Sequence, residues 1–192
     1  MAGIGFNAEE AEGVNRNSSI TFSHEQAYRD FLGTLVERRT AAASAIRIRE
    51  FDEMRERIEL SRRDIRSSLN VPLGTISFDY LGNFSTFSPE LLTQKHQVYG
   101  DFTLLNVYND AIVDILSSEK LRRVYEDIRS GVDACQATCE YLIVCGGGAP
   151  SNKLSENGSF ESTTTAYCTL RVKRACDLVL ERMEEDSSVG GS

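Results

Sequence analysis

The sequence predicts an all-α fold, an elongated helical bundle built on two long helical regions, with one short strand or hairpin near residues 75–87. Three observations carry this prediction. Residues 23–70 contain no proline and one glycine, their apolar residues recur at helical spacing, and residues 101–145 repeat the same pattern. Two helical regions of matching length can lie antiparallel and cover each other's apolar faces.

The first helical region is expected to begin at Ser23, which with Gln26 three residues later has the pattern of a capping box. The apolar positions before and after residues 44–50 are out of phase, which predicts a bend, a break or a change of partner face there. A straight helix over this region would span roughly 70 Å, whereas a compact chain of this size is about 42 Å across. The region must therefore fold back, or the molecule is elongated and covers its exposed stripe with other helices or subunits.

The same region is rich in arginine. It has nine arginines between Arg38 and Arg66, no lysine and six acids, and nine minus six gives a local charge of +3. A guanidinium-rich face suits phosphate or carboxylate partners. The alternative is a solvated helix whose charged side chains pair with one another, as Glu53 with Arg57 and Glu59 with Arg63 would at i,i+4 spacing. We favour the second interpretation, because nucleic-acid binders normally carry a basic domain.

The bulk composition narrows the class of protein. The 192 residues carry a net charge of −8, which argues against nucleic acid as a main partner and against anionic membranes. No run of 18 apolar residues occurs, so no membrane partner is expected. The N-terminal MAGIGFNAEE lacks the features of a signal peptide. These features and the odd count of five cysteines predict a cytoplasmic or virion location, without secretion through a signal peptide.

Between the two long regions, the sequence predicts short elements. Residues 75–81 alternate apolar and polar side chains as a half-buried strand does, and a hairpin with residues 83–87 across Gly82 is one possible pairing. Ser88, Pro89 and an acid at position 90 are typical of a helix start, and we expect that helix to end near residue 100.

After the second long region, Gly146 to Pro150 predicts a firm helix stop, followed by a polar surface loop and a last helix over residues 163–183. The predicted division of the chain is an N-terminal arm at 1–22, a helical domain at 23–183 with a surface loop at 146–162, and a flexible acidic tail at 184–192.

Few residues are candidates for a catalytic or metal-binding site. His24 and Glu25 do not begin a zinc-protease motif, because residue 28 is a tyrosine. Cys135 and Cys139 have the i,i+4 spacing of two metal ligands, which Cys168 and Cys176 could complete. Because these cysteines fall in the hydrophobic stripe, core packing is the favoured interpretation. The sequence therefore predicts no metal, no cofactor, no small-molecule substrate and no enzymatic activity.

The favoured function is a structural, assembly-forming subunit, such as a virion or phage component or a ring or filament protein. Its partners would be copies of itself or other protein subunits. Small side chains allow a close helix crossing, and acidic ends could dock on the arginine-rich face of a neighbour. The candidate interface residues are Arg38, Arg39, Ala41, Ala42, Ala45, Arg49, Arg57, Arg63, Glu9, Glu10, Glu12, Glu184 and Glu185.

Two alternatives remain open. One is a cytosolic helical adaptor whose groove binds a partner segment. The other is a thiol-dependent enzyme centred on Cys135, Cys139 or Cys145.

Overall fold

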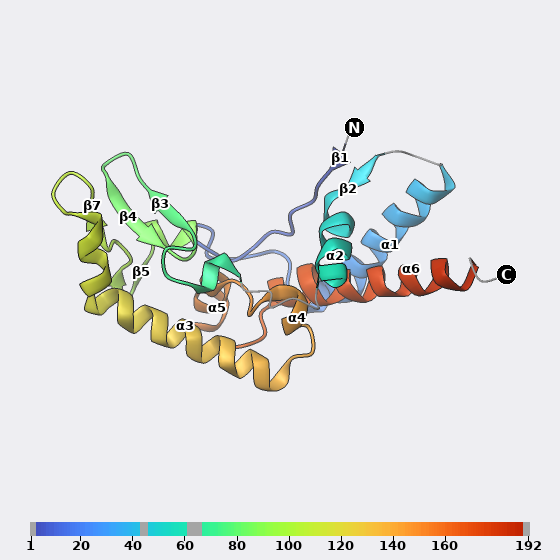
Figure 1. The fold of residues 1–192 in the computed structure, drawn as a ribbon. Helices are drawn as coiled ribbons and strands as arrows, with labels where there is room; N and C mark the ends of the chain where they lie inside the picture. The colour runs from blue at the N-terminus through green and yellow to red at the C-terminus, as the bar shows by residue number, and fades with distance from the viewer. Residues whose placement is uncertain (1–2, 43–45, 61–66, 190–192) are drawn as a thin grey trace.

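The structure, a computed structural model, describes residues 3–42, 46–60 and 67–189. Of these described residues, 57% are helical and 11% lie in strands, arranged in three small sheets (Figure 1). The protein is therefore mixed α/β, and the predicted all-α elongated bundle is wrong. In the described part of the chain, no helix is both long and apolar enough to span a membrane.

The predicted break in the first helical region is confirmed. Helix α1 (Glu25–Ala41) and helix α2 (Arg49–Leu60) are separate, with strand β2 (Arg47–Ile48) between them. Strand β2 pairs in parallel with β1 (Gly3–Ile4), so the N-terminal arm is joined to the turn between the helices. The one-turn helix η1 (Phe22–His24) precedes α1, and its cap is Thr21 in place of the expected Ser23.

One hydrophobic core lies among the helices at the end of the molecule that holds both termini (Figure 1). Helices α1 and α2 pack there against the π-helix η5 (Cys168–Arg174) and its continuation α6 (Ala175–Val189). The short helix α4 (Leu142–Cys145) contributes Val144. The buried residues are Leu32, Ile48, Phe51, Met54, Val144, Ala175, Cys176, Leu178 and Val179.

A second core lies between helix α3 (Glu119–Thr138) and an antiparallel sheet at the other end of the molecule (Figure 1). The sheet has the order β3-β4-β7, from strands Ile76–Phe78, Asn83–Thr86 and Leu105–Asn106. This confirms the predicted hairpin near residues 75–87. A two-stranded sheet of β5 (Lys95–His96) and β6 (Gly100–Asp101) and the one-turn helix η2 (Ser68–Asn70) complete this part.

The prediction of a continuous helix from residue 101 is wrong as far as residue 118. Strands β6 and β7 and the 3-10 helix η4 (Ile112–Ser117) occupy that stretch. Its turn is stabilised by side-chain acceptors, since Asp110 Oδ2 lies 2.7 Å from the Asn106 amide. Such local bonds compete with helix formation. The restart is at Ser118, whose hydroxyl accepts from the Leu121 amide at 3.2 Å and caps α3.

Two further predictions need correction. The helix expected from Pro89 to about residue 100 is the short 3-10 helix η3 (Pro89–Thr93). The surface loop expected at 146–162 contains helix α5 (Pro150–Asn157), whose first residues are buried although most are polar. Lys153 is 4% exposed and its ammonium donates to the Gly131 carbonyl at 3.0 Å. Hydrogen bonding of this kind lets a polar segment enter the interior, which composition does not reveal.

Candidate functional site: a glycine turn fixed by Asn70

The turn between α4 and α5 has a backbone conformation that favours glycine at three successive residues. Gly146, Gly147 and Gly148 all have positive φ angles of 65°, 101° and 76°. A Cβ atom on Gly147 would lie 2.7 Å from a methyl carbon of Val132 and 3.1 Å from Asn70 Nδ2. The predicted helix stop is confirmed, and the turn also leads into α5 with Pro150 in its first turn.

A buried asparagine fixes this turn. Asn70, which is 8% exposed, donates from Nδ2 to the carbonyl oxygens of Gly146 and Gly148, both at 2.9 Å. These two hydrogen bonds therefore join η2 to a turn about 76 residues further along the chain. On the opposite side of the turn, the Gly147 amide donates to Cys145 Sγ at 3.4 Å.

Cys145 ends α4 immediately before this turn. Burial raises the pKa of Cys145, and the neighbouring Cys139 and Cys135 raise it further, while the amides of Gly147 and Gly148 lower it.

Cys168 is the first residue of η5. Burial raises its pKa to about 11, with a lowering effect of Lys173 and smaller raising effects of Cys145 and Cys139. All five cysteines are free thiols. Because the pKa values of Cys145 and Cys168 are raised, these thiols are mostly protonated at neutral pH and are poor nucleophiles. The raised pKa of Cys145 therefore gives no support to a thiol-dependent enzyme centred on that residue.

Cys176 is 4% exposed in the helical core, where burial, Asp177 and Glu140 raise its pKa to about 11.

The sequence offered Cys135, Cys139, Cys168 and Cys176 as a possible set of metal ligands. Among the residues that the structure describes, no three side chains of His, Cys, Asp or Glu are placed to hold one metal ion.

The predicted interface arginines make contacts within their own chain. Arg39 lies 3.8 Å from Asp52. Arg49 Nη2 donates to the Phe6 carbonyl at 2.9 Å, and Arg57 Nη1 reaches the Val144 carbonyl at 3.5 Å. Arg38, Ala41 and Ala42 are exposed at the end of α1, whereas Ala45 and Arg63 lie outside the described residues.

The predicted acidic residues are also partly used within the chain. Glu9 accepts from the Ser19 amide at 2.7 Å, and Glu185 pairs with Arg182 at 2.7 Å. Glu10 accepts from Asn152 at 3.0 Å and Glu12 accepts from Ser151 at 2.7 Å, so both fasten the arm to α5. Glu184 is exposed.

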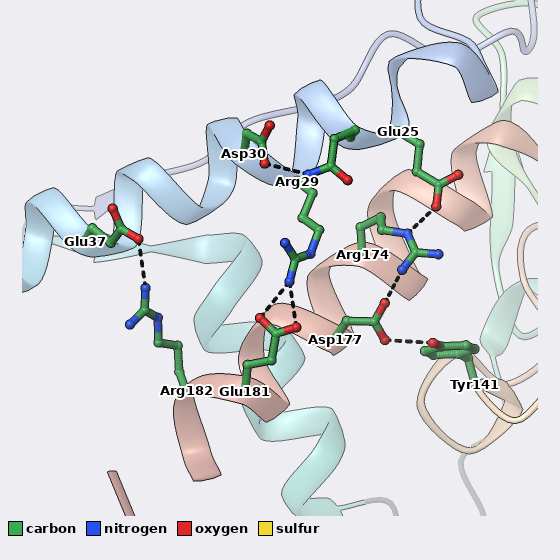
Figure 2. A network of polar contacts seen from close by, with 10 residues as sticks. Glu25, Arg29, Asp30, Glu37, Tyr141, Arg174, Asp177, Glu181 and Arg182 are labelled. Atoms are coloured by element: carbon green, nitrogen blue, oxygen red, sulfur yellow. Dashed lines mark hydrogen bonds and ion pairs between the residues drawn. The ribbon is translucent and has the colours of Figure 1, made fainter. Parts of the chain in front are cut away.

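Helix α1 is linked by ion pairs to η5 and to its continuation α6 (Figure 2). Arg174 lies between Glu25 and Asp177, and Asp177 also accepts from the Tyr141 hydroxyl at 2.7 Å. Further along, Arg29 contacts both oxygens of Glu181 at 2.6 and 2.8 Å. Glu37 and Arg182 form the outermost pair at 3.3 Å.

Comparison with known proteins identifies one similar chain. Neither a protein-family model nor a solved structure matches. The chain is 42% identical over 183 residues to an uncharacterized protein of Synechocystis sp., and the match covers 95% of this chain. It covers 46% of the relative, so the chain spans about half the length of the curated protein to which it is similar.

Proposed function

We propose that this chain is a structural, assembly-forming subunit of a larger complex, with a cytosolic helical adaptor that binds a partner segment as the alternative. The observation that carries the proposal is an exposed apolar surface on one hairpin. Large apolar side chains are exposed around the β3–β4 hairpin, with Tyr80 90%, Leu81 55% and Phe78 52% exposed. Exposed apolar side chains that gather on one surface are typical of interaction sites. A virion component and a cellular scaffold both fit this role.

Sedimentation velocity at low and high protein concentration and salt tests the assembly proposal. Defined large species that dissolve when Phe78 and Tyr80 are changed to Ser would support assembly through the hairpin surface. A monomer at every concentration would favour the adaptor.

A further inference from the structure

We infer that two copies of this chain pair through strand β3, edge to edge and antiparallel, about a two-fold axis at Ser77. This pairing rests on the proposed assembly role and specifies its partner, a second copy of the chain. Strand β3 is the outer strand of the sheet β3-β4-β7, and among the described residues β4 is its one strand partner. An unprotected outer strand is a template on which another strand can pair.

The hydrogen bonds of the hairpin show which backbone groups of β3 face the open edge. The Asp79 amide donates to the Asn83 carbonyl at 3.0 Å, so these two residues form a hydrogen-bonded pair. Along antiparallel strands such pairs alternate with non-hydrogen-bonded pairs. The register of β3 and β4 therefore places Ile76 and Phe78 in non-hydrogen-bonded pairs. Their N–H and C=O groups point away from β4, toward the open edge of the sheet.

Strand β3 lacks the features that usually keep sheet edges apart. Such edges carry lysine, proline, a bulge or an inward-pointing charge. Residues 75–78 are Thr, Ile, Ser and Phe, without a charge or a proline. Ile76 is 50% exposed and Phe78 is 52% exposed, and the Phe78 ring lies 5.1 Å from the buried ring of Phe84. The apolar face of the sheet thus continues onto β3, where about half of each side chain is open to solvent.

The partner is a second copy because the strand is complementary to itself. About an axis at Ser77, Ile76 of each copy lies opposite Phe78 of the other. These two pairs use the outward-facing N–H and C=O groups of both strands. Asp79 lies opposite Thr75, so the two carboxylates do not face each other, as they would in a register that is destabilised by like charges.

The exposed apolar surface around β3 is large enough for a pair of copies. Tyr80 is 90% exposed and Tyr108 is 77% exposed. The Tyr108 ring lies on the hairpin turn, since a Cβ on Gly82 would be 2.5 Å from its Cε2 atom. At about 200 Å² for each aromatic side chain, these two rings and Phe78 present roughly 900 Å² in two copies. Leu81, which is 55% exposed, brings the total to about the 1,000 Å² that a specific interface needs.

Proline at position 76 tests the hydrogen bonds of the open edge. Ile76→Pro removes an N–H that faces the edge, which an outer strand tolerates because that N–H does not bond to β4. The matched control is Ile76→Ala, which loses the same side chain and keeps the N–H. In sedimentation equilibrium, the dissociation constant of the pair should be about tenfold higher or more in Ile76→Pro than in Ile76→Ala, since each pair loses two N–H···O bonds.

Cross-linking locates the two-fold axis and does not depend on the folding of a proline variant. In Ser77→Cys the two introduced thiols lie opposite each other in a non-hydrogen-bonded pair, where side chains approach most closely. Mild oxidation should therefore link two copies through position 77. The matched control is Ser159→Cys, at a serine that is half-buried like Ser77 and lies outside the sheet. The unaltered chain corrects for its own five free thiols.

The results distinguish this pairing from the broader assembly proposal. Self-association that weakens equally in Ile76→Pro and Ile76→Ala would overturn the pairing through β3 and leave the assembly proposal standing. Cross-linking in Ser77→Cys that is no greater than in Ser159→Cys would do the same. A monomer at every concentration of the unaltered chain would refute both.

Discussion

Arg171 lies 3.0 Å from Glu50 in the interior, and this ion pair joins η5 to the first turn of α2. The carboxylate of Glu50 is almost fully buried, with 1% of its side chain exposed. Its Oε1 also accepts from the Phe6 amide at 2.8 Å and from Arg49 at 2.7 Å. One acid thus connects the N-terminal arm, α2 and η5.

Replacing Glu50 by alanine should lower the free energy of unfolding by roughly 3–5 kcal/mol, because Arg171 would be left as a buried, unpaired charge. Urea unfolding followed by circular dichroism measures this change. The control is Glu56→Ala on the exposed face of the same helix, which should stay within about 0.5 kcal/mol of the unaltered protein. A similar loss in both variants would contradict the role given to the buried pair.

The lowered pKa of Glu50 predicts that the protein loses stability in acid. Burial raises the pKa of Glu50, but the bonds from Arg49, the Phe6 amide and Arg171 outweigh burial and leave the pKa lowered from 4.5. A lowered pKa gives stability that is present above pH 4.5 and lost as the pH falls through the folded value. Unfolding measured in acid should show this loss, and Glu50→Gln should show less of it.

Docking of the N-terminal arm should weaken as the pH rises. Burial, together with the charges of Glu10 and Glu90, raises the pKa of Glu12 to about 8, against a lowering effect of Ser151. Because the pKa of Glu12 is raised on folding, its contribution to arm docking is complete below pH 4.5 and is lost as the pH rises through about 8.

Limited proteolysis of residues 1–22 across this pH range measures arm docking. Cleavage should increase with pH in the unaltered chain and vary less in Glu12→Gln. The control is Glu9→Gln, at an exposed acid whose pKa is lowered by its bonds to Ser19. Cleavage that does not change with pH in the unaltered chain would refute the prediction.

Two glycines in helices should respond in opposite ways to alanine. A Cβ on Gly131 in α3 would lie 2.1 Å from the Phe160 carbonyl oxygen, so Gly131→Ala should destabilise the protein by about 1–3 kcal/mol or more. Gly33 in α1 has only an ordinary contact of 4.0 Å with Leu178. Gly33→Ala should stabilise the protein by roughly 0.5–1 kcal/mol through helix propensity. Thermal unfolding of both variants tests whether helix contact or propensity decides each site.

The ion pair of Arg29 and Glu181 in Figure 2 should contribute little despite its two short contacts. Its side chains are 32% and 49% exposed, and pairs of this exposure typically couple by about 0.2–1 kcal/mol. A double-mutant cycle with alanine at both positions measures the coupling, which should fall further in high salt. Coupling well above 1 kcal/mol would show that the α1–α6 interface is less solvated than the structure indicates.

The elements that the sequence predicted correctly depend on local signals. The break between α1 and α2 followed from a phase change in the apolar pattern, and the β3–β4 hairpin from the alternation in residues 75–81 and the turn residue Gly82. The restart of the helix at Ser118 depends on a capping hydrogen bond, in which the Ser118 hydroxyl accepts from the amide of Leu121 three residues further along the chain. Each involves neighbours in the chain, whose geometry is fixed by backbone stereochemistry.

The errors arose where distant contacts outweighed local propensity. Residues 101–118 have helical apolar spacing, but Leu105 pairs with Phe84 in a sheet and the turn at Asn106 is held by Asp110. Helix α5 reads as a polar loop because its burial depends on partners such as Gly131, which is 22 residues away. The spacing of apolar residues describes one segment at a time, so it does not reveal contacts with distant parts of the chain.

The candidate site shows the same division. The sequence by itself determined the thiols, the triple glycine and the helix stop, because residue type and chain stereochemistry suffice for them. Only the tertiary structure decided that Cys176 enters the core and that Asn70 fixes the turn. These relationships join residues up to 76 positions apart, and packing of whole elements brings them together.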